Sequence, residues 1–442
     1  MSYSAVIEQL NAMAPELHTQ PGAPRRKFSL DEIGILLEAL GNPHREFRVV
    51  LVAGTNGKGS TAATLSSILK ESGLYTGLFT SPHLERPNER IRVDGEDIAD
   101  DDFARRYDAV HVAAEKAVLE GKLAQMPSFF EVLTAMALLH FARRKVDIAV
   151  LEVGMGGRLD ATNITSPLVS VITDISLDHT EWLGSTVAAI AREKAGILRA
   201  NGTLVTLPQH PEANQALGEV AVELNVRGVN AAAYIPPRDF NPDGAGDVYT
   251  VEVLGKEIEV ASPLHGPHQH RNVALAIAAA VELAESHALP VTAESVAGGI
   301  RKTRWPGRLE RIAARNAEWV LDVAHNPAGA WALRSSLNGI TPAPKVLIFS
   351  CLRDKPLAEL AQILFPLFDR VVFAPIASLR ATPLKELLAA AEQTGTPAES
   401  AETVAEALLL ARKQADGAPV VVSGSVYLVG EARHWLLGEA GK

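Results

Sequence analysis

Short apolar segments alternate with stretches of helical periodicity along most of the chain. Segments rich in valine, isoleucine and leucine predict buried strands at residues 47–53, 75–80, 146–153, 168–175 and 203–207. The stretches between them predict helices at residues 61–72, 130–144 and 186–199. Because strands that alternate with helices in this order form parallel sheets with right-handed crossovers, we expect an α/β fold.

The pattern changes after residue 230. Two strictly alternating segments, 248–253 and 257–260, predict a local antiparallel hairpin. An alanine-rich helix is expected at 272–287, and the following Gly298, Gly299 and the basic segment 301–308 have the composition of a linker. Strand segments resume at 319–323, 345–350, 370–374 and 419–423, with helices between them. We therefore expect two domains, residues 1–299 and residues 300–442.

Composition narrows the class of protein. The 442 residues are 47% hydrophobic and 21% charged, which is typical of globular domains that bury a core. The formal net charge of −10 argues against non-specific nucleic-acid binding but allows a small anionic ligand in a local basic pocket. The single Cys351 excludes an intramolecular disulfide. No secretion signal or membrane-spanning segment is recognisable, so we expect a cytoplasmic protein with no membrane partner.

A glycine-rich segment directly follows the first predicted strand. It reads Gly54, Thr55, Asn56, Gly57, Lys58, Gly59 and Ser60. Glycines let backbone N–H groups turn toward an anion, the lysine can reach phosphates, and the serine hydroxyl can ligate Mg²⁺. The segment departs from the common phosphate-loop pattern because Val52 stands at the first glycine position and Gly59 is inserted before the hydroxyl residue. A purely structural glycine connection is the alternative.

Three further polar residues stand near the ends of predicted strands or helices. Glu152 ends the strongest apolar strand, where a buried carboxylate needs a partner or a metal ion, and a salt bridge to Arg158 is the structural alternative. His179 can ligate a divalent cation or simply be solvated. Lys194 has the surroundings of an ordinary surface lysine at a helix end, judged from the residues alone.

Taken together, the motifs resemble one family. They are GTNGKGS (54–60), TSPHL (80–84), SFFE (128–131), EVGMGGRLDATN (152–163), LDHT (177–180), REKAGI (192–197), LDVAHNP (321–327) and SGSVYL (423–428). This order of motifs resembles the folylpolyglutamate synthases, including their bifunctional dihydrofolate synthase form, which belong with the Mur ligases. The resemblance implies an N-terminal phosphate-loop ATPase domain and a C-terminal Rossmann-like domain, with catalysis in the cleft between them.

The resemblance also implies roles for individual residues. Residues 54–60, Asn272, Arg308 and Asp322 are implied to bind the nucleotide. Ser60, Ser81, Glu152, His179 and a carbamylated Lys194 are implied to hold two Mg²⁺ ions. The implied catalytic residues are Lys58, Glu152, His179, Lys194 and His325. The implied substrate-binding residues are Phe28, Ser128, Phe130, Glu131, Leu159, Asp160 and Ala161.

Local structure offers alternatives for several of these positions. Asn272 could be the N-cap of the helix that it opens. Ser128 with Glu131, and Ser29 with Glu32, match the capping-box spacing ahead of a helix. Asp322 and Asn326 stand at a strand-to-helix junction, where such residues also stabilise turns.

The implied reaction activates a folate carboxylate by phosphoryl transfer from ATP, after which the amine of L-glutamate displaces phosphate. Residues 158–163 and 128–131 resemble the bifunctional enzymes that also use dihydropteroate, whereas residues 25–28 do not reproduce their acidic Asp-Leu-Gly segment. The expected partners are small molecules, and the resemblance implies a monomer. A monofunctional enzyme, a Mur-type cell-wall ligase and a nucleotide-binding module without ligase activity remain as alternatives.

Overall fold

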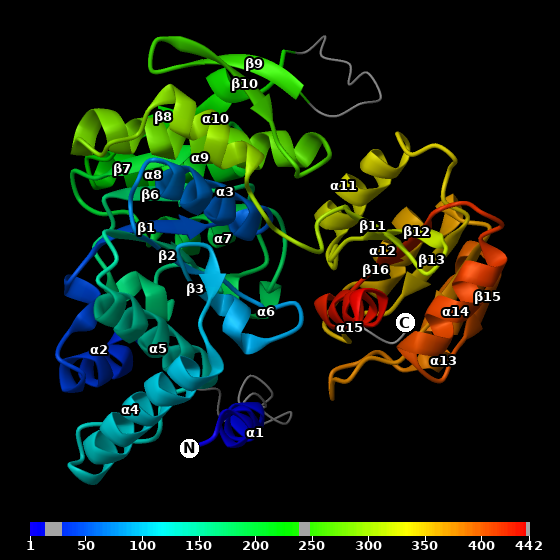
Figure 1. Ribbon diagram of the computed structural model, residues 1–442, viewed down its shortest axis with the longest axis horizontal. Helices are drawn as coiled ribbons and strands as arrows, with labels where there is room; N and C mark the ends of the chain where they lie inside the picture. Colours follow the sequence, from blue (N-terminus) through cyan, green and yellow to red (C-terminus); the bar gives the residue numbers. More distant parts are fainter. Residues whose placement is uncertain (14–28, 238–247, 439–442) are drawn as a thin grey trace.

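Two sheets, one on either side of residue 300, organise the chain. The computed structural model describes residues 1–13, 29–237 and 248–438. The first sheet has eight strands in the order β4-β3-β2-β5-β1-β6-β7-β8, and the second has six in the order β11-β12-β16-β13-β14-β15. Figure 1 shows the two sheets, with their helices, as two bodies joined by the segment between α10 and β11.

The first sheet is largely parallel. Its strands are β1 (Arg48–Ala53), β2 (Thr76–Phe79), β3 (Ile91–Val93), β4 (Glu96–Asp97), β5 (Ile148–Glu152), β6 (Val169–Ile172), β7 (Thr203–Thr206) and β8 (Arg227–Asn230). Only the β2–β3 and β3–β4 pairs are antiparallel. The central strands are buried along almost their whole length, which explains why they read as continuous apolar runs.

Helices cover both faces of this sheet. One face is covered by α1 (Tyr3–Met13), α2 (Leu30–Ala39), α4 (Asp100–Leu119), α5 (Phe129–Arg144), α6 (Thr180–Leu183), α7 (Val187–Ala195) and α8 (Pro211–Glu223). The other is covered by α3 (Lys58–Glu71), α9 (Pro267–His287) and α10 (Ala293–Arg301), with the hairpin β9 (Val248–Val253) and β10 (Lys256–Ala261) packed beside them. Each face therefore closes its own hydrophobic core.

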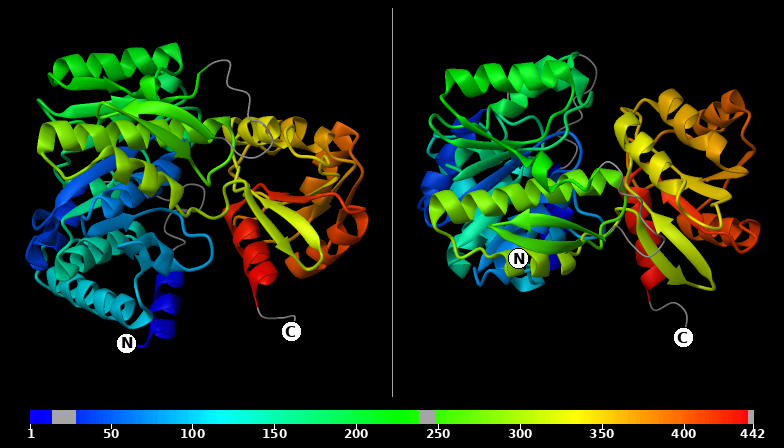
Figure 2. Two further views of the ribbon diagram at one scale, coloured as in Figure 1. Left: turned by 45° about the horizontal axis from the view of Figure 1, so that its top comes forward. Right: turned by 90° about the horizontal axis from the view of Figure 1, so that it is seen from above.

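The second sheet has the same layered construction. Its strands are β11 (Glu310–Ala314), β12 (Ala317–Leu321), β13 (Val346–Phe349), β14 (Arg370–Phe373), β15 (Ala398–Ser400) and β16 (Val420–Ser423). Its helices are α11 (Pro327–Leu337), α12 (Leu357–Leu364) and α13 (Leu384–Thr394) on one face, and α14 (Val404–Gln414) and α15 (Val426–Leu437) on the other. Figure 2 shows α15 on the side of this body that faces the first one.

Most of the elements expected from the sequence are present, including the antiparallel hairpin at β9–β10. Two expectations are wrong. Helix α9 begins at Pro267, so Asn272 is an interior helical residue and Gly266 occupies the N-cap. Gly298 and Gly299 lie inside α10, and only the segment after Arg301 connects the two sheets. The antiparallel strands β3, β4 and β11 were not predicted from the sequence pattern.

Among the described residues, no helix is both long enough and apolar enough to cross a membrane.

Candidate active site

The glycine-rich segment forms a compact loop between β1 and α3. Gly54 and Gly57 have φ angles of 149° and 87°, and Gly57 is the N-cap of α3. The N–H groups of Thr55 and Asn56 donate to the carbonyl oxygen of Asp174 at 2.9 and 3.2 Å. The first turn of any α-helix leaves its N–H groups without intrahelical partners. The first turn of α3, which contains Lys58 and the buried Ser60, presents such N–H groups to the loop. Such an arrangement attracts phosphate.

Lys194 is buried against this loop, and the expectation of a surface lysine is wrong. Its side chain is 4% exposed, and its Nζ donates to the carbonyl oxygen of Gly54 at 2.7 Å. Burial, reinforced by the charge of Lys58, lowers the pKa of Lys194 to about 7. The Lys58 amine also donates to the carbonyl oxygens of Gly54 and Thr55, each at 3.1 Å. Two amines thus converge on one loop.

Glu152 ends β5, directly beside β1 of the phosphate loop. Its carboxylate is buried and accepts the N–H of Ser81 at 3.1 Å. The alternative salt bridge to Arg158 is not formed, because Arg158 pairs with Glu193 at 3.0 Å. Burial raises the pKa of Glu152, and the positive charge of Lys58 opposes that rise. Glu152 is therefore a buried acidic group close to the lysine of the phosphate loop.

Asn272 lies against the phosphate loop from α9. A Cβ atom at Gly57 would come within 2.0 Å of the Asn272 Oδ1 atom, so the two residues are in close contact. On the other domain, Asp322 directly follows β12 and accepts the N–H groups of Leu309 and Ala324 at 3.0 and 2.9 Å. Asp322 therefore holds the connection just after Arg308 in place, in keeping with the turn role that the sequence allowed.

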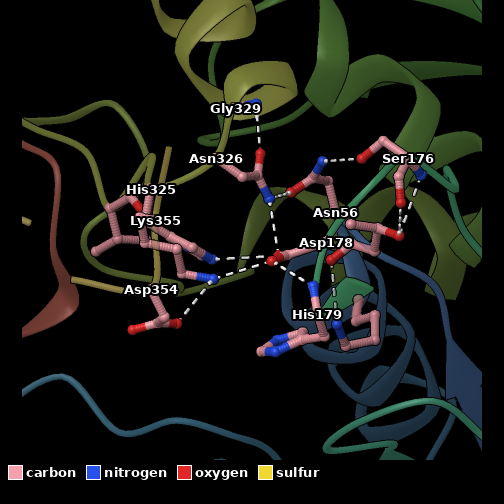
Figure 3. Close-up of polar contacts among 12 residues, drawn as sticks. Asn56, Ser176, Asp178, His179, His325, Asn326, Gly329, Asp354 and Lys355 are labelled. Atoms are coloured by element: carbon pink, nitrogen blue, oxygen red, sulfur yellow. Dashed lines mark hydrogen bonds and ion pairs between the residues drawn. The ribbon is translucent and has the colours of Figure 1, made fainter. Parts of the chain in front are cut away.

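Asp178 joins the two domains at the site (Figure 3). Its carboxylate accepts from Lys355 Nζ at 2.9 Å and from the Asn326 side chain at 3.2 Å. Asn326 also donates to Asn56 in the phosphate loop at 3.0 Å and caps α11. Although burial alone would raise the pKa of Asp178, His179, Lys355 and His325 hold it well below its ordinary value. A charged bridge therefore spans the domains beside the phosphate loop.

His179 and His325 both lie beside Asp178 (Figure 3). His179 caps α6 with a φ of 50°, and His325 places its Nε2 atom 3.9 Å from Asp178. Desolvation lowers the pKa of each histidine to about 4, against the opposing charge of Asp178. Both rings are therefore neutral near pH 7, the form in which imidazole binds a cation or accepts a proton.

Beside the phosphate loop and the Asp178 bridge, α5 and the loop after β5 form a third side of the site, which we call the half-apolar wall. Ser128 and Glu131 form the expected capping box, in which Glu131 accepts from the Ser128 N–H at 2.8 Å. Ser29 is the N-cap of its helix and accepts the N–H of Asp31 at 3.1 Å, rather than that of Glu32 as the expected capping box would require. Asp160 is buried and satisfied within its own loop by the N–H groups of Met155 and Thr162.

A cavity of about 460 Å³ is lined by residues of both domains. The expected site residues that line it are Ser81, Ser128, Phe130, Glu131, Leu159, Asp160, Ala161, His179, Arg308 and His325. The phosphate loop, Glu152, Lys194, Asn272 and Asp322 are not among its lining residues. Phe28 falls outside the described residues, as do Arg25, Arg26 and Lys27.

Several lining residues were not predicted from the sequence. Arg90 is buried, and its guanidinium lies 5.4 Å from the centre of the Phe129 ring. Trp305 packs on Gly59, where a Cβ atom would come within 2.6 Å of the indole ring. Lys355 and Arg380 line the cavity from the second domain. The sequence could have pointed to Lys355 as a site residue, because Lys355 follows the carboxyl end of a buried strand. No comparable sequence feature marks Arg90 or Arg380.

The donors around the phosphate loop suit Mg²⁺ only in part. Within residues 1–13, 29–237 and 248–438, no three His, Cys, Asp or Glu side chains gather into one metal site. Lys58 acts electrostatically on both Glu152 and His179, so one carboxylate and one imidazole lie near the loop, with hydroxyls at Ser60 and Ser81. Mg²⁺ typically takes one or two carboxylates together with phosphate oxygens and water. This donor set fits Mg²⁺ that nucleotide phosphates help to bind.

Comparisons with known proteins agree with this geometry. Residues 52–280 match the Mur ligase middle domain, and residues 307–426 match the glutamate ligase domain of Mur ligases. The folylpolyglutamate synthase of Lacticaseibacillus casei is 36% identical over 448 residues, which cover 99% of each chain. The dihydrofolate synthase/folylpolyglutamate synthase of Bacillus subtilis is 34% identical over 419 residues, which cover 92% of this chain and 94% of the relative.

The structure is similar to that of the Mycobacterium tuberculosis folylpolyglutamate synthase complexed with ADP and AMPPCP, with a TM-score of 0.88, 34% identity and complete coverage of both chains. The likeness thus extends over both sheets and the cleft between them. The chain therefore belongs to the folylpolyglutamate synthase family of the Mur ligases.

Proposed function

We propose that this protein is an ATP-dependent ligase that joins L-glutamate to folates through an acyl-phosphate intermediate. The observation that carries the proposal is a phosphate loop with two lysine amines next to a cavity that is lined by apolar residues of the first domain and by Lys355 and Arg380 of the second. The names of the relatives and the ADP and AMPPCP complex of the M. tuberculosis protein support it.

The phosphate loop supplies the positive field for phosphoryl transfer. Lys58 and the N–H groups at the start of α3 face the position of the phosphates, and Asn272 and Arg308 flank it. We infer that Glu152, His179, Ser60 and Ser81 hold Mg²⁺, which neutralises phosphate charge when bound. The neutral His325 can take the proton that the glutamate amine releases.

The half-apolar wall suits a flat aromatic substrate such as the pterin of a folate. Phe130 and Leu159 provide apolar surface, and the Ser128–Glu131 pair provides polar groups at its edge. Because dihydropteroate shares this ring system, we propose that the protein also makes dihydrofolate. The monofunctional alternative differs only in that second substrate.

The cationic wall suits the carboxylates of glutamate. Lys355 and Arg380 line the cavity from the second domain, where Lys355 pairs with Asp178 at 2.9 Å and Arg380 with Asp354 at 2.5 Å. An incoming glutamate held there would present its amine to the activated carboxylate across the cleft. We therefore divide the roles between the domains as 1–299 for ATP and folate and 300–442 for glutamate.

We further propose that Lys194 is carbamylated in the active enzyme. Its buried amine, whose pKa is lowered to about 7, is partly neutral near that pH and so able to react with carbon dioxide. The product would be an anion beside the phosphate loop, where it could help to hold a second Mg²⁺. Intact mass spectrometry in bicarbonate-buffered solution tests this proposal, because Lys194→Met removes the carbamate adduct.

The half-apolar wall and the cations of the second domain come from one chain, which supports a monomer. Soluble metabolites as substrates support a cytoplasmic location.

The direct test of function is mass spectrometry of ATP-, Mg²⁺- and glutamate-dependent products, with tetrahydrofolate and dihydropteroate offered separately. Glutamate addition to both indicates a bifunctional enzyme, and addition to tetrahydrofolate alone indicates a monofunctional one. No addition by folded, ATP-binding protein would contradict the folate assignment and favour a Mur-type substrate.

Lys58→Ala should abolish this ligation. The change removes the amine that faces the phosphates, and loss of one such stabilising group costs about a hundredfold or more in kcat. The measurement is product formation at saturating substrates, with Lys302→Ala as control because Lys302 is an exposed lysine just after the end of α10. ATP-dependent ligation that persists in Lys58→Ala would show that the phosphate loop is not the reaction centre.

A further inference from the structure

The loop between β2 and η3 (Pro87–Arg90) is anchored to the second domain. Leu84 from this loop packs against the hydrophobic core formed by α14, α15 and the second sheet. Beside it, Glu85 accepts from Arg433 of α15 at 2.6 Å, and Arg433 also pairs with Glu310 at 3.0 Å. A partly buried residue of the first domain thus packs against the core of the second.

Gly430 makes this close approach possible. A Cβ atom at Gly430 would come within 1.9 Å of the Leu84 carbonyl oxygen, so any side chain there forces the loop and α15 apart. Figure 1 shows α15 at the face of the second domain nearest this loop. The contact is therefore backbone against backbone, which fixes the loop tightly.

Hydrogen bonds within the anchored loop connect its residues to one another. Glu89 accepts the N–H groups of Leu84, Glu85 and Arg86 at 2.7, 2.8 and 2.7 Å. His83 accepts from the buried Arg90 at 2.9 Å. Because these bonds tie residues 83–86 into one unit, a displacement at Leu84 moves the rest of the loop as well.

The same loop carries Ser81. Its N–H donates to the buried Glu152 carboxylate at 3.1 Å, and its side chain lines the cavity. Ser81 lies only three residues from the anchor at Leu84. The loop therefore links α15 of the second domain to Glu152, the acidic group beside the phosphate loop.

We propose that residues 81–86 are a coupling loop through which α15 holds Ser81 against Glu152, with Leu84, Gly430 and Arg433 as positioning residues for the ligase reaction. The coupling of the loop to α15 is inferred from the contacts alone, whereas its effect on the ligase reaction rests on the proposed function. Closure of the domains then completes the cation-binding end of the site, and separation of the domains dismantles it.

The test is hydrogen–deuterium exchange of the free protein, followed by ligation kinetics. In Gly430→Ala, we expect exchange in the peptide that contains residues 81–86 to rise at least about tenfold, while exchange in β1 and the phosphate loop stays unchanged. Arg433→Gln should raise it about threefold. Gly218→Ala is the matched control, because Gly218 lies on the exposed surface of α8 with open space at its Cβ position.

Kinetics then separates positioning from folding. In Gly430→Ala and Arg433→Gln, we expect kcat to fall at least about fivefold and the Mg²⁺ concentration for half-maximal rate to rise, with KM for ATP unchanged. Glu85→Gln combined with Arg433→Gln should be no worse than the more damaging single change, because the two residues act as a pair.

Wild-type exchange of residues 81–86 in both Gly430→Ala and Arg433→Gln would overturn the proposal, and so would faster exchange with unaltered kcat and Mg²⁺ dependence. If Gly430→Ala does not fold, Arg433→Gln and Glu85→Gln provide the same test. Faster exchange in a protein that ligates no glutamate even as wild type would instead refute the proposed function while the loop contact stands.

Discussion

Two lysine amines lie on one loop of the site, and only one of them is buried. Lys58 is partly exposed, whereas Lys194 is enclosed and donates to the Gly54 carbonyl oxygen. Desolvation and the neighbouring Lys58 both disfavour its charge, so the folded protein releases the Lys194 proton near pH 7. At the scale of the residue, the environment of this amine decides its chemistry.

This burial predicts a specific pH dependence of stability. The unfolded chain keeps the Lys194 proton up to about pH 10.5, whereas the folded chain loses it near pH 7. Because the unfolded state binds more protons between these values, the free energy of unfolding should rise with pH, by about 1.4 kcal/mol per pH unit from this group. Lys194→Met should flatten that rise, measured by denaturant unfolding in buffer purged of carbon dioxide and metal.

The exposed Lys302 provides the control for this experiment, since Lys302→Met should leave the slope unchanged. A wild-type slope retained in Lys194→Met would mean that another group titrates over this range.

At the scale of the element, the crossing of α10 and α3 places the phosphate loop. Gly299 of α10 faces the backbone of Ile68 in α3, where a Cβ atom would come within 2.3 Å of the Ile68 Cα atom. Gly298 faces the flexible Glu71 side chain at 3.4 Å. The two adjacent glycines therefore serve different purposes: one permits helix contact, and the other has room for a side chain.

The pair of glycines gives a matched prediction. Gly299→Ala should lower the free energy of unfolding by about 2 kcal/mol, because two helix backbones must separate. Gly298→Ala should be neutral or stabilise by up to about 1 kcal/mol, because alanine favours the helix. Denaturant unfolding of both variants measures the difference. Equal effects would show that the helix crossing does not depend on Gly299.

At the scale of the whole molecule, polar contacts hold the two domains at the cleft. Asp178 and Lys355 are 12% and 7% exposed, so their ion pair is shielded from water. The nearest other carboxylate to Lys355 is that of Asp354, at 3.9 Å. Removing Asp178 alone therefore leaves a buried amine poorly paired.

Asp178→Ala should loosen the domains at a cost of about 3 kcal/mol. We expect cleavage by protease in residues 302–309 to speed up, and the radius of gyration from X-ray scattering to increase. The double variant Asp178→Ala with Lys355→Met should be less impaired, because the unpaired charge is gone. Additive damage in the double variant would contradict this account.

The same pair predicts how the molecule responds to acid. Because the pKa of Asp178 is held well below its ordinary value of 3.8, its contribution to stability is complete above that value and is lost as pH falls further. The loss of domain contact on acidification should therefore be weaker in Asp178→Asn, as scattering between about pH 5 and 2 would show.

The central strands, the phosphate loop and the two-sheet layout follow from local sequence patterns. The central strands are apolar on both faces, and the glycine-rich loop lies between strand and helix, so neighbouring residues suffice to predict them. The capping box of α5 can also be predicted from neighbouring residues, since Ser128 and Glu131 interact within one turn. The family resemblance added roles for particular residues, which local patterns by themselves do not supply.

Tertiary structure alone decided the burial of Lys194, the bridge from Asp178 to Lys355 and the helical state of Gly298 and Gly299. Each depends on contacts between segments far apart in the chain. Local periodicity records which face of an element is apolar, but it does not record which other element approaches that face. From local patterns alone, a charged residue is therefore predicted to be exposed and a pair of glycines to form a linker, until the distant segment that contacts them is known.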